Sequence, residues 1–198
     1  MTLAAERTDF SLARKAMIDS QLRPSGVSED WILAAMNRVP REDHVPATAR
    51  DHAYIDRAIP LGNGRALPAP LVHGKMLGEA APTAGDRILL VGCGSGYLAA
   101  LLDGIDAKVE QIDATAAATQ TPSGEYSLLL IDGAIEQLPE GLAAALAEGG
   151  RIVTGLVDRG VTRLAVGRKV AGTVSLLPVA DIGIPVLADF AAPKRWSF

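Results

Sequence analysis

The sequence lacks the features needed for disulfide cross-links, a membrane span or a large net charge. It has one cysteine, Cys93, which excludes a disulfide framework and any zinc site built from cysteine ligands. Its formal net charge at pH 7 is −4, and this acidic balance argues against a nucleic-acid surface. The longest stretch without a charged residue, residues 88–102, is interrupted by glycines and is too short to span a bilayer. We therefore predict no membrane span and no nucleic-acid partner.

The sequence does contain enough apolar material for a globular fold. Its 198 residues suit one domain, and 48% of them are hydrophobic, which excludes intrinsic disorder. Glu6 and Asp9 stand where a secretion signal would have its apolar core, so we predict a cytoplasmic protein. His44, His52 and His73 show no metal-ligand spacing. We expect these histidines at the surface or in caps, and no metal site.

The first part of the chain differs from the rest in charge and in residue pattern. Residues 1–57 carry much of the charge and predict a helical extension, with one helix over 10–22 capped by Asp9 and a second that ends before Pro40. We expect Trp31 of the second helix to lie in the core. Residues 58–82 follow as a covering loop and a short helix: three prolines and two glycines within 58–72 predict an irregular loop, and 72–80 predict the helix.

Residues 83–198 have the pattern of an α/β core. Apolar runs predict strands at 87–91, 109–113, 126–132 and 151–154, alternating with helices at 97–102 and 138–148. This alternation is typical of a parallel sheet with helices on both faces. Only 12 residues, 114–125, separate the second and third strands, enough for one short helix, so strand 109–113 should lie at the sheet edge. Residues 163–188 predict an antiparallel closing piece, and the three parts together predict a single domain.

The most informative motif is the turn L-L-V-G-C-G-S-G-Y at 89–97. It follows a buried strand and opens a helix, where glycines let a ligand approach main-chain N–H groups. Asp113 ends the next strand, where a carboxylate can accept both hydroxyls of a ribose. Asp132 ends another buried strand, and either lines the site or caps the following turn. The predicted cofactor-binding residues are Gly92, Cys93, Gly94, Ser95, Gly96, Tyr97, Asp113 and Asp132.

The spacing of the glycines distinguishes between cofactors. A dinucleotide fingerprint requires G-x-G-x-x-G, and Tyr97 stands at the position of its third glycine. The observed G-x-G-x-G better suits S-adenosylmethionine, which has no diphosphate to cradle. A turn that needs glycine for packing alone is the other interpretation, but three glycines followed by a correctly spaced acid exceed that need. Cys93 has no histidine near it in sequence, so we interpret it as a small packing residue and assign no catalytic residue.

Five blocks, taken in order, carry a resemblance to a known family. They are M-I-D-S-Q-L-R-P-S-G-V (17–27), A-A-M-N-R-V-P-R-E-D-H-V-P (34–46), A-Y-I-D-R-A-I-P-L-G-N-G (53–64), the glycine turn, and G-L-A-A-A-L-A-E-G-G-R-I-V (141–153). In order and spacing they resemble the protein-L-isoaspartate O-methyltransferases, and the closing F-x-x-P-K-R-W-S-F resembles a bacterial subgroup. The resemblance implies a class I S-adenosylmethionine-dependent methyltransferase fold, a Rossmann-like α/β sheet with an N-terminal helical extension. It also implies methyl transfer from S-adenosylmethionine to isoaspartyl carboxylates of damaged proteins.

Three features depart from the pattern that the resemblance implies. Ala66 and Pro68 replace the threonine and serine of the covering loop, so two hydroxyls at the methyl-transfer centre are absent. Leu90 replaces an acid that helps to hold the methionine end of the cofactor. The 12-residue connection omits the family's acidic loop, which holds the adenine. We therefore expect cofactor binding to be weakened or lost, with one wall of the adenine site missing or rebuilt from elsewhere.

The sequence leaves two main functions open. The glycine turn and Asp113 favour an active isoaspartyl methyltransferase, whose partner is an isoaspartyl-containing protein or peptide. The missing hydroxyls and the shortened connection in the cofactor-binding half of the sheet favour a degenerate, non-catalytic methyltransferase fold that binds a partner. An NAD-dependent dehydrogenase is a third hypothesis, and it lacks both the fingerprint glycine and an obvious His or Lys dyad. None of these observations determines the oligomeric state.

Overall fold

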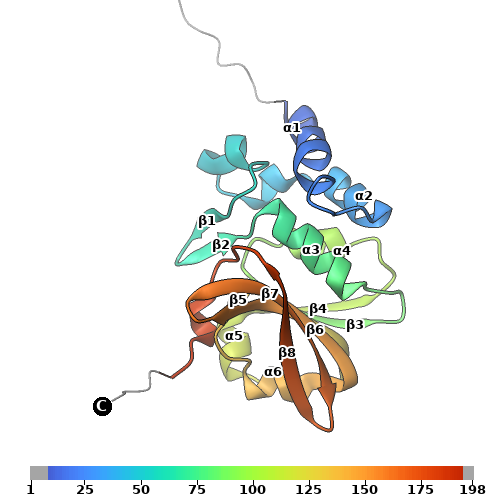
Figure 1. The fold of residues 1–198 in the computed structure, drawn as a ribbon, viewed down its shortest axis with the longest axis vertical. Helices are drawn as coiled ribbons and strands as arrows, with labels where there is room; N and C mark the ends of the chain where they lie inside the picture. Colours follow the sequence, from blue (N-terminus) through green and yellow to red (C-terminus); the bar gives the residue numbers. More distant parts are fainter. Residues whose placement is uncertain (1–8, 194–198) are drawn as a thin grey trace, which may run out of the picture.

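The computed structural model describes residues 9–193, and its centre is a six-stranded sheet (Figure 1). Residues 1–8 and 194–198, and with them part of the predicted extension and of the closing motif, lie outside the described range. The strands are β3 (Arg87–Gly92), β4 (Lys108–Asp113), β5 (Tyr126–Ile135), β6 (Leu146–Asp158), β7 (Val161–Val170) and β8 (Thr173–Asp181). Their order across the sheet is β4-β3-β5-β6-β7-β8.

The pairing of the strands matches the sequence prediction. β4, β3, β5 and β6 run parallel, while β7 and β8 pair antiparallel and close the sheet. β4 is an edge strand, as the short 114–125 connection predicted, and that connection holds one short helix, α5 (Ala114–Thr119). The chain leaves β3 in one direction to form β4 and returns to form β5 on the other side. Ligands of open α/β sheets bind at such a reversal, outside the carboxyl ends of the strands.

Helices cover both faces of the sheet because successive strand residues point to opposite sides. On one face Ile88, Leu90 and Leu128 pack with the N-terminal helices and with α4 (Tyr97–Leu102), while α3 (Pro70–Ala80) packs on β6 and β7. On the other face Leu89 and Leu129 pack against α5, α6 (Glu140–Ala145) and a 3-10 helix, Ala188–Phe190. Figure 1 shows these two layers above and below the sheet.

The N-terminal extension forms part of the same core. Helix α1 (Phe10–Met17) begins at Asp9, whose carboxylate accepts hydrogen bonds from two backbone N–H groups, and it continues as a π-helical turn over Ile18–Leu22. Helix α2 (Asp30–Arg38) ends before Pro40, as predicted. Met17 and other buried side chains of the extension share one cluster with the sheet residue Leu90. The expectation that Trp31 is a core residue is wrong, because its position on α2 leaves it 36% exposed.

Two further expectations need correction. The loop predicted over 58–72 contains a hairpin, β1 (Ile59–Gly62) and β2 (Arg65–Leu67), because Asn63 and its flanking glycines adopt the positive φ values of a tight turn. Helix α3 therefore begins earlier than predicted, at Pro70. The helix predicted over 138–148 ends at Ala145, and the chain enters β6 at Leu146, whose carbonyl accepts a hydrogen bond from Lys169 of β7.

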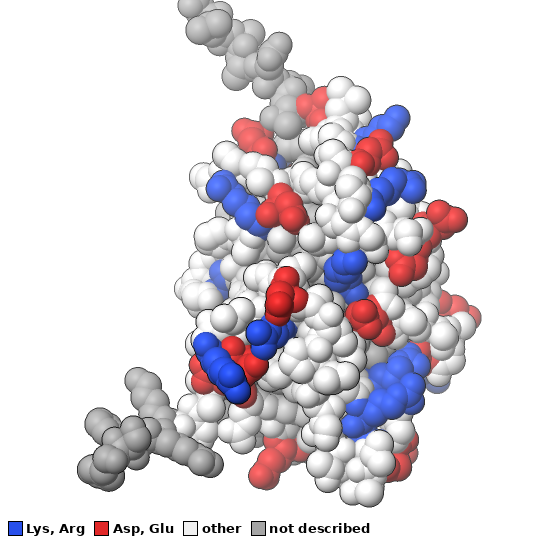
Figure 2. Space-filling model, viewed as in Figure 1, with Lys and Arg blue, Asp and Glu red and all other residues white. Residues whose placement is uncertain are grey.

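Acidic and basic side chains are interspersed over the face seen in Figure 2. Within residues 9–193, no helix has the length and apolar character needed to cross a membrane.

Candidate cofactor-binding site

The glycine turn joins β3 to α4 and is exposed at Gly94. Gly94 and Gly96 have φ values of 98° and 71°, which side chains other than glycine rarely adopt. A Cβ added at Gly94 would meet no atom within 4 Å, so a ligand can approach the main chain there. The Ser95 hydroxyl accepts a hydrogen bond from the Tyr97 N–H at 3.1 Å and so fixes the start of α4. The turn is therefore open to a small molecule at Gly94.

Asp113 lies beside this turn at the carboxyl end of the edge strand. It is the register partner of Gly92, and its side chain is 57% exposed. Its Oδ1 accepts a hydrogen bond from the Thr115 N–H at 2.8 Å and caps helix α5. That backbone hydrogen bond is the main cause that lowers the pKa of Asp113, so the carboxylate is ionised at neutral pH. An exposed anion next to an open glycine turn fits the ribose of a nucleoside cofactor.

Below the turn lies a buried polar cluster centred on Asp132. Its Oδ1 is 2.9 Å from His73 Nε2, and its Oδ2 is 3.0 Å from Cys93 Sγ. Burial raises the pKa of Asp132, but the imidazole, the thiol and the Arg41 guanidinium outweigh burial and leave the pKa below its usual value. Burial, together with the Asp132 charge, raises the pKa of the Cys93 thiol to about 12. Cys93 is therefore a protonated hydrogen-bond donor at neutral pH, and not a thiolate nucleophile.

Arg41 of the extension completes the cluster and is itself fully buried. Its Nη1 lies 3.4 Å from His73 Nδ1, while other guanidinium nitrogens donate to the carbonyls of Ala53 and Pro68. The guanidinium also lies 4.9 Å from the centre of the Tyr97 ring. The cluster thus joins the extension, the covering segment and the end of β5 to the glycine turn.

Tyr97 receives contacts from two histidines. The rings of His44 and His73 each lie 5.3 Å from the Tyr97 ring in edge-to-face geometry. His44 Nδ1 is 2.9 Å from the carbonyl oxygen of Ser95, within the turn. The extension therefore touches the glycine turn directly.

The sequence prediction missed the roles of His73 and Arg41. The expectation of a surface or capping role is wrong for His73, which is fully buried and bonded to Asp132. A signal was available, because His73 lies three and four residues before the apolar Met76 and Leu77, on the same face of helix α3. Arg41 carried no such signal, since its partners are 12, 27 and 32 residues away in sequence.

The structure also gives the positions of the three residues that depart from the family pattern. Ala66 lies on β2, opposite Pro60 of β1. Pro68 presents its carbonyl oxygen to Arg41. Leu90 is 1% exposed and packs in the core, so it offers no polar group to a ligand.

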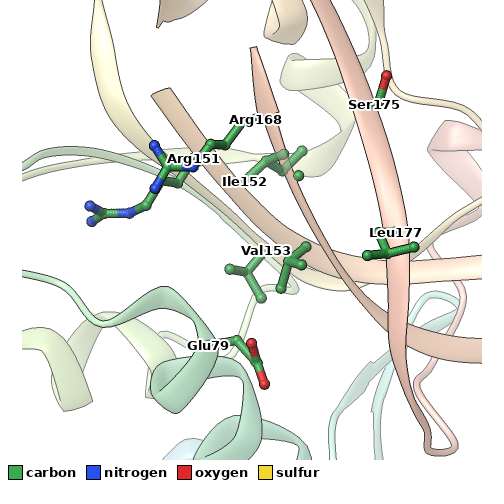
Figure 3. A pocket seen from close by; sticks show the side chains of 9 residues that line it. Glu79, Arg151, Ile152, Val153, Arg168, Ser175 and Leu177 are labelled. Atoms are coloured by element: carbon green, nitrogen blue, oxygen red, sulfur yellow. The ribbon is translucent and has the colours of Figure 1, made fainter. Parts of the chain in front are cut away.

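A hollow of about 370 Å³ elsewhere on the sheet is separate from this site (Figure 3). It lies between Glu79 of α3 and strands β6, β7 and β8, with Arg151, Arg168 and Leu177 among its lining residues. Arg151 pairs with Leu128 at the start of β5, so the hollow lies toward the amino-terminal edge of the parallel strands, away from the glycine turn. Among residues 9–193 there is also no group of three His, Cys, Asp or Glu side chains that could hold a metal ion.

The fold resembles that of solved methyltransferases. A protein-L-isoaspartate O-methyltransferase from Plasmodium falciparum, determined in complex with S-adenosyl-L-homocysteine, superposes with a TM-score of 0.72 at 17% identity, covering 92% of this chain and 100% of that one. A second solved protein-L-isoaspartate O-methyltransferase matches with the same TM-score over 90% of this chain and 67% of its own. The chain therefore has the class I S-adenosylmethionine-dependent methyltransferase fold.

Sequence comparison identifies the family within that class. The model of the protein-L-isoaspartate(D-aspartate) O-methyltransferase family matches residues 13–116. A protein-L-isoaspartate O-methyltransferase of Koribacter versatilis is 31% identical, covering 91% of this chain and 93% of its own length. One from Roseiflexus castenholzii is 33% identical over 92% of this chain and 95% of its own. The chain belongs to the protein-L-isoaspartate O-methyltransferase family.

Proposed function

We propose that this protein transfers a methyl group from S-adenosylmethionine to the carboxylates of isoaspartyl residues in damaged proteins. The observation that carries the proposal is the open turn at Gly94 beside the exposed, ionised Asp113, in a chain of this family. The backbone of the turn, from Gly92 to Tyr97, and the carboxylate of Asp113 would hold the cofactor. The side chains of Cys93 and Asp132 face inward, so we assign them to holding the turn from below.

This reaction requires few catalytic side chains from the protein. The acceptor carboxylate is already an anion at neutral pH, so no general base is required. When bound, the cofactor supplies an electrophilic methyl group on a sulfonium. The chain has to align the acceptor with that methyl and exclude water. The β1–β2 hairpin is placed for this, because the Arg65 side chain of β2 reaches the end of β4 and lies 3.8 Å from Asp113.

We propose in addition that cofactor affinity and turnover are lower than in intact relatives. Ala66 and Pro68 supply no hydroxyl, Leu90 supplies no acid, and the shortened connection 114–125 has α5 as its one helix. If each loss costs about 1–3 kcal/mol, as a missing hydrogen bond to a charged group does, the sum is on the order of 4 kcal/mol. That corresponds to about a thousandfold. A degenerate binding protein without turnover, docking an isoaspartyl-containing protein, is the second candidate, and these same losses favour it.

The test uses purified full-length protein, an isoaspartyl peptide and S-adenosylmethionine labelled in its methyl group. We expect base-labile label in the peptide, at a rate far below that of an intact family member. The Asp113→Asn variant should transfer still less, because asparagine keeps the cap of α5 but removes the charge that holds the ribose. Incorporation of label at the rate of the intact family member would refute the proposed reduction in cofactor affinity and turnover. No label, with retained peptide binding, would favour the non-catalytic candidate.

A further inference from the structure

Arg65 links the covering hairpin to the 3-10 helix Ala188–Phe190 and lies beside Asp113 of the candidate site. It lies on β2, and its side chain is 16% exposed. Its Nη1 is 3.0 Å from Asp189 Oδ2, and its Nη2 donates to Asp189 Oδ1 at 3.1 Å. Nη2 also donates to the Thr115 hydroxyl at 3.0 Å and lies 3.8 Å from Asp113 Oδ1. One guanidinium therefore touches three elements that surround the predicted ribose position.

The carboxylate that holds Arg65 is itself firmly placed. Asp189 lies in the 3-10 helix Ala188–Phe190 and accepts a further hydrogen bond from the Thr115 hydroxyl at 2.9 Å. The segment before it pairs with the end of β5, where the Leu187 N–H donates to the Ala134 carbonyl at 2.8 Å. The Phe190 carbonyl accepts from the backbone of Glu136. The Arg65–Asp189 pair is thus anchored to the sheet.

We propose that Arg65 forms the wall of the nucleoside site by stacking its guanidinium on the adenine of the cofactor. This inference rests on the proposed function and names the residue that replaces the missing covering segment. An adenine bonded to a ribose at Asp113 comes within reach of a guanidinium 3.8 Å from that carboxylate. Arg65 Nη2 donates to Asp189 Oδ1, while Nη1 makes an ion pair with Asp189 Oδ2 and no hydrogen bond within residues 9–193. Asp189 therefore holds the guanidinium near Asp113, and the planar guanidinium has a face that can stack on an adenine.

The experiment measures the affinity of full-length protein for S-adenosyl-L-homocysteine, and for adenosine alone, by titration calorimetry. We expect Arg65→Ala to weaken both ligands by the same factor, about tenfold, as loss of a cation–π contact does. Arg65→Lys should recover only part of this loss, because a lysine ammonium can still make a cation–π contact but has no planar face to stack on the adenine. Asp189→Asn should give a smaller loss, because Arg65 remains but is held less firmly.

Arg163→Ala is the matched control. Arg163 of β7 also pairs with two carboxylates, of Asp158 and Asp181, but three strands separate β7 from β4. Its loss should leave both affinities unchanged. Unchanged or tighter binding in Arg65→Ala, or full affinity in Arg65→Lys, would overturn the role given to Arg65 and would leave the proposed function standing. Failure of the unmodified protein to bind S-adenosyl-L-homocysteine would instead refute the proposed cofactor.

Discussion

At the scale of single residues, the buried cluster below the glycine turn holds the guanidinium of Arg41 and the carboxylate of Asp132, with the imidazole ring of His73 between them. A guanidinium only donates hydrogen bonds, so we assign the acceptor role to His73 Nδ1, which faces Arg41. The proton then lies on Nε2 and is donated to Asp132. A cation and an anion are thereby buried together, and removing either leaves the other uncompensated.

This arrangement predicts how Asp132 contributes to stability as the pH changes. Its pKa is lower in the folded protein, so its contribution is full above the unfolded value of about 3.9 and is lost as the pH falls through the folded value. Asp132→Asn should reduce the free energy of unfolding by about 3–5 kcal/mol at neutral pH, because Arg41 keeps an unpaired charge. Urea unfolding at a series of pH values should show that the difference in free energy of unfolding between the unmodified protein and Asp132→Asn becomes smaller below about pH 4.

Asp19→Asn is the control for that series, because Asp19 is 56% exposed and pairs with Arg23, which is also exposed. Its free energy of unfolding should change by less than about 1 kcal/mol at every pH. A constant gap between the unmodified protein and Asp132→Asn from neutral to acid pH would contradict the role given to this carboxylate.

At the scale of elements, the last described segment matters as much as the regular strands. Residues 185–187 lie beside the end of β5, where Ala134 and Val186 form a parallel bridge. This close approach is possible because Gly133 has no side chain, and a Cβ there would lie 2.5 Å from Leu187 Cγ. The segment in turn carries Asp189 to its place beside Arg65 and Thr115.

Gly133→Ala should therefore separate this segment from β5. We expect a loss of about 1–3 kcal/mol in the free energy of unfolding, the usual cost of overpacking. Gly183→Ala is the matched control, since a Cβ at Gly183 meets no atom within 4 Å and its φ is not positive. Thermal unfolding of the two variants measures the difference. Equal melting temperatures would show that the segment is not packed as described.

At the scale of the whole molecule, the extension and the sheet share one core. Of the residues in the larger hydrophobic cluster, 12 lie between Met17 and Tyr54, and they pack with sheet residues such as Leu128 and Val153. At about 1.5–3 kcal/mol for each large apolar side chain, their burial exceeds the total stability of about 5–15 kcal/mol that a domain retains. We propose that residues 9–193 fold as a single unit.

A chain that begins at residue 58 should consequently fail to fold. We expect it to lack the near-ultraviolet circular dichroism of packed aromatic rings and to show no cooperative urea transition, whereas the full chain should unfold in one. A fragment of 58–198 with a native-like cooperative transition would show that the extension is an independent addition.

The sequence by itself determined the parts of this protein that depend on local pattern. Alternating apolar runs predicted the parallel sheet, the 12-residue connection placed β4 at its edge, and the spacing from Gly92 to Asp113 located the candidate site. Each of these features follows from neighbouring residues and from the limited reach of a short connection.

Only the tertiary structure decided what surrounds the site. The partners of Arg41, His73 and Asp132 lie 12 to 59 residues apart, and Arg65 meets Asp189 across 124. Such contacts leave no periodic mark in the sequence, because they depend on where complete elements pack. The early end of α6 was missed for the same reason, because a contact with β7 outweighed the local pattern. The hairpin over 59–67 was missed although its signal is local, because Asn63-Gly64 is a typical turn pair and was read as part of an irregular loop.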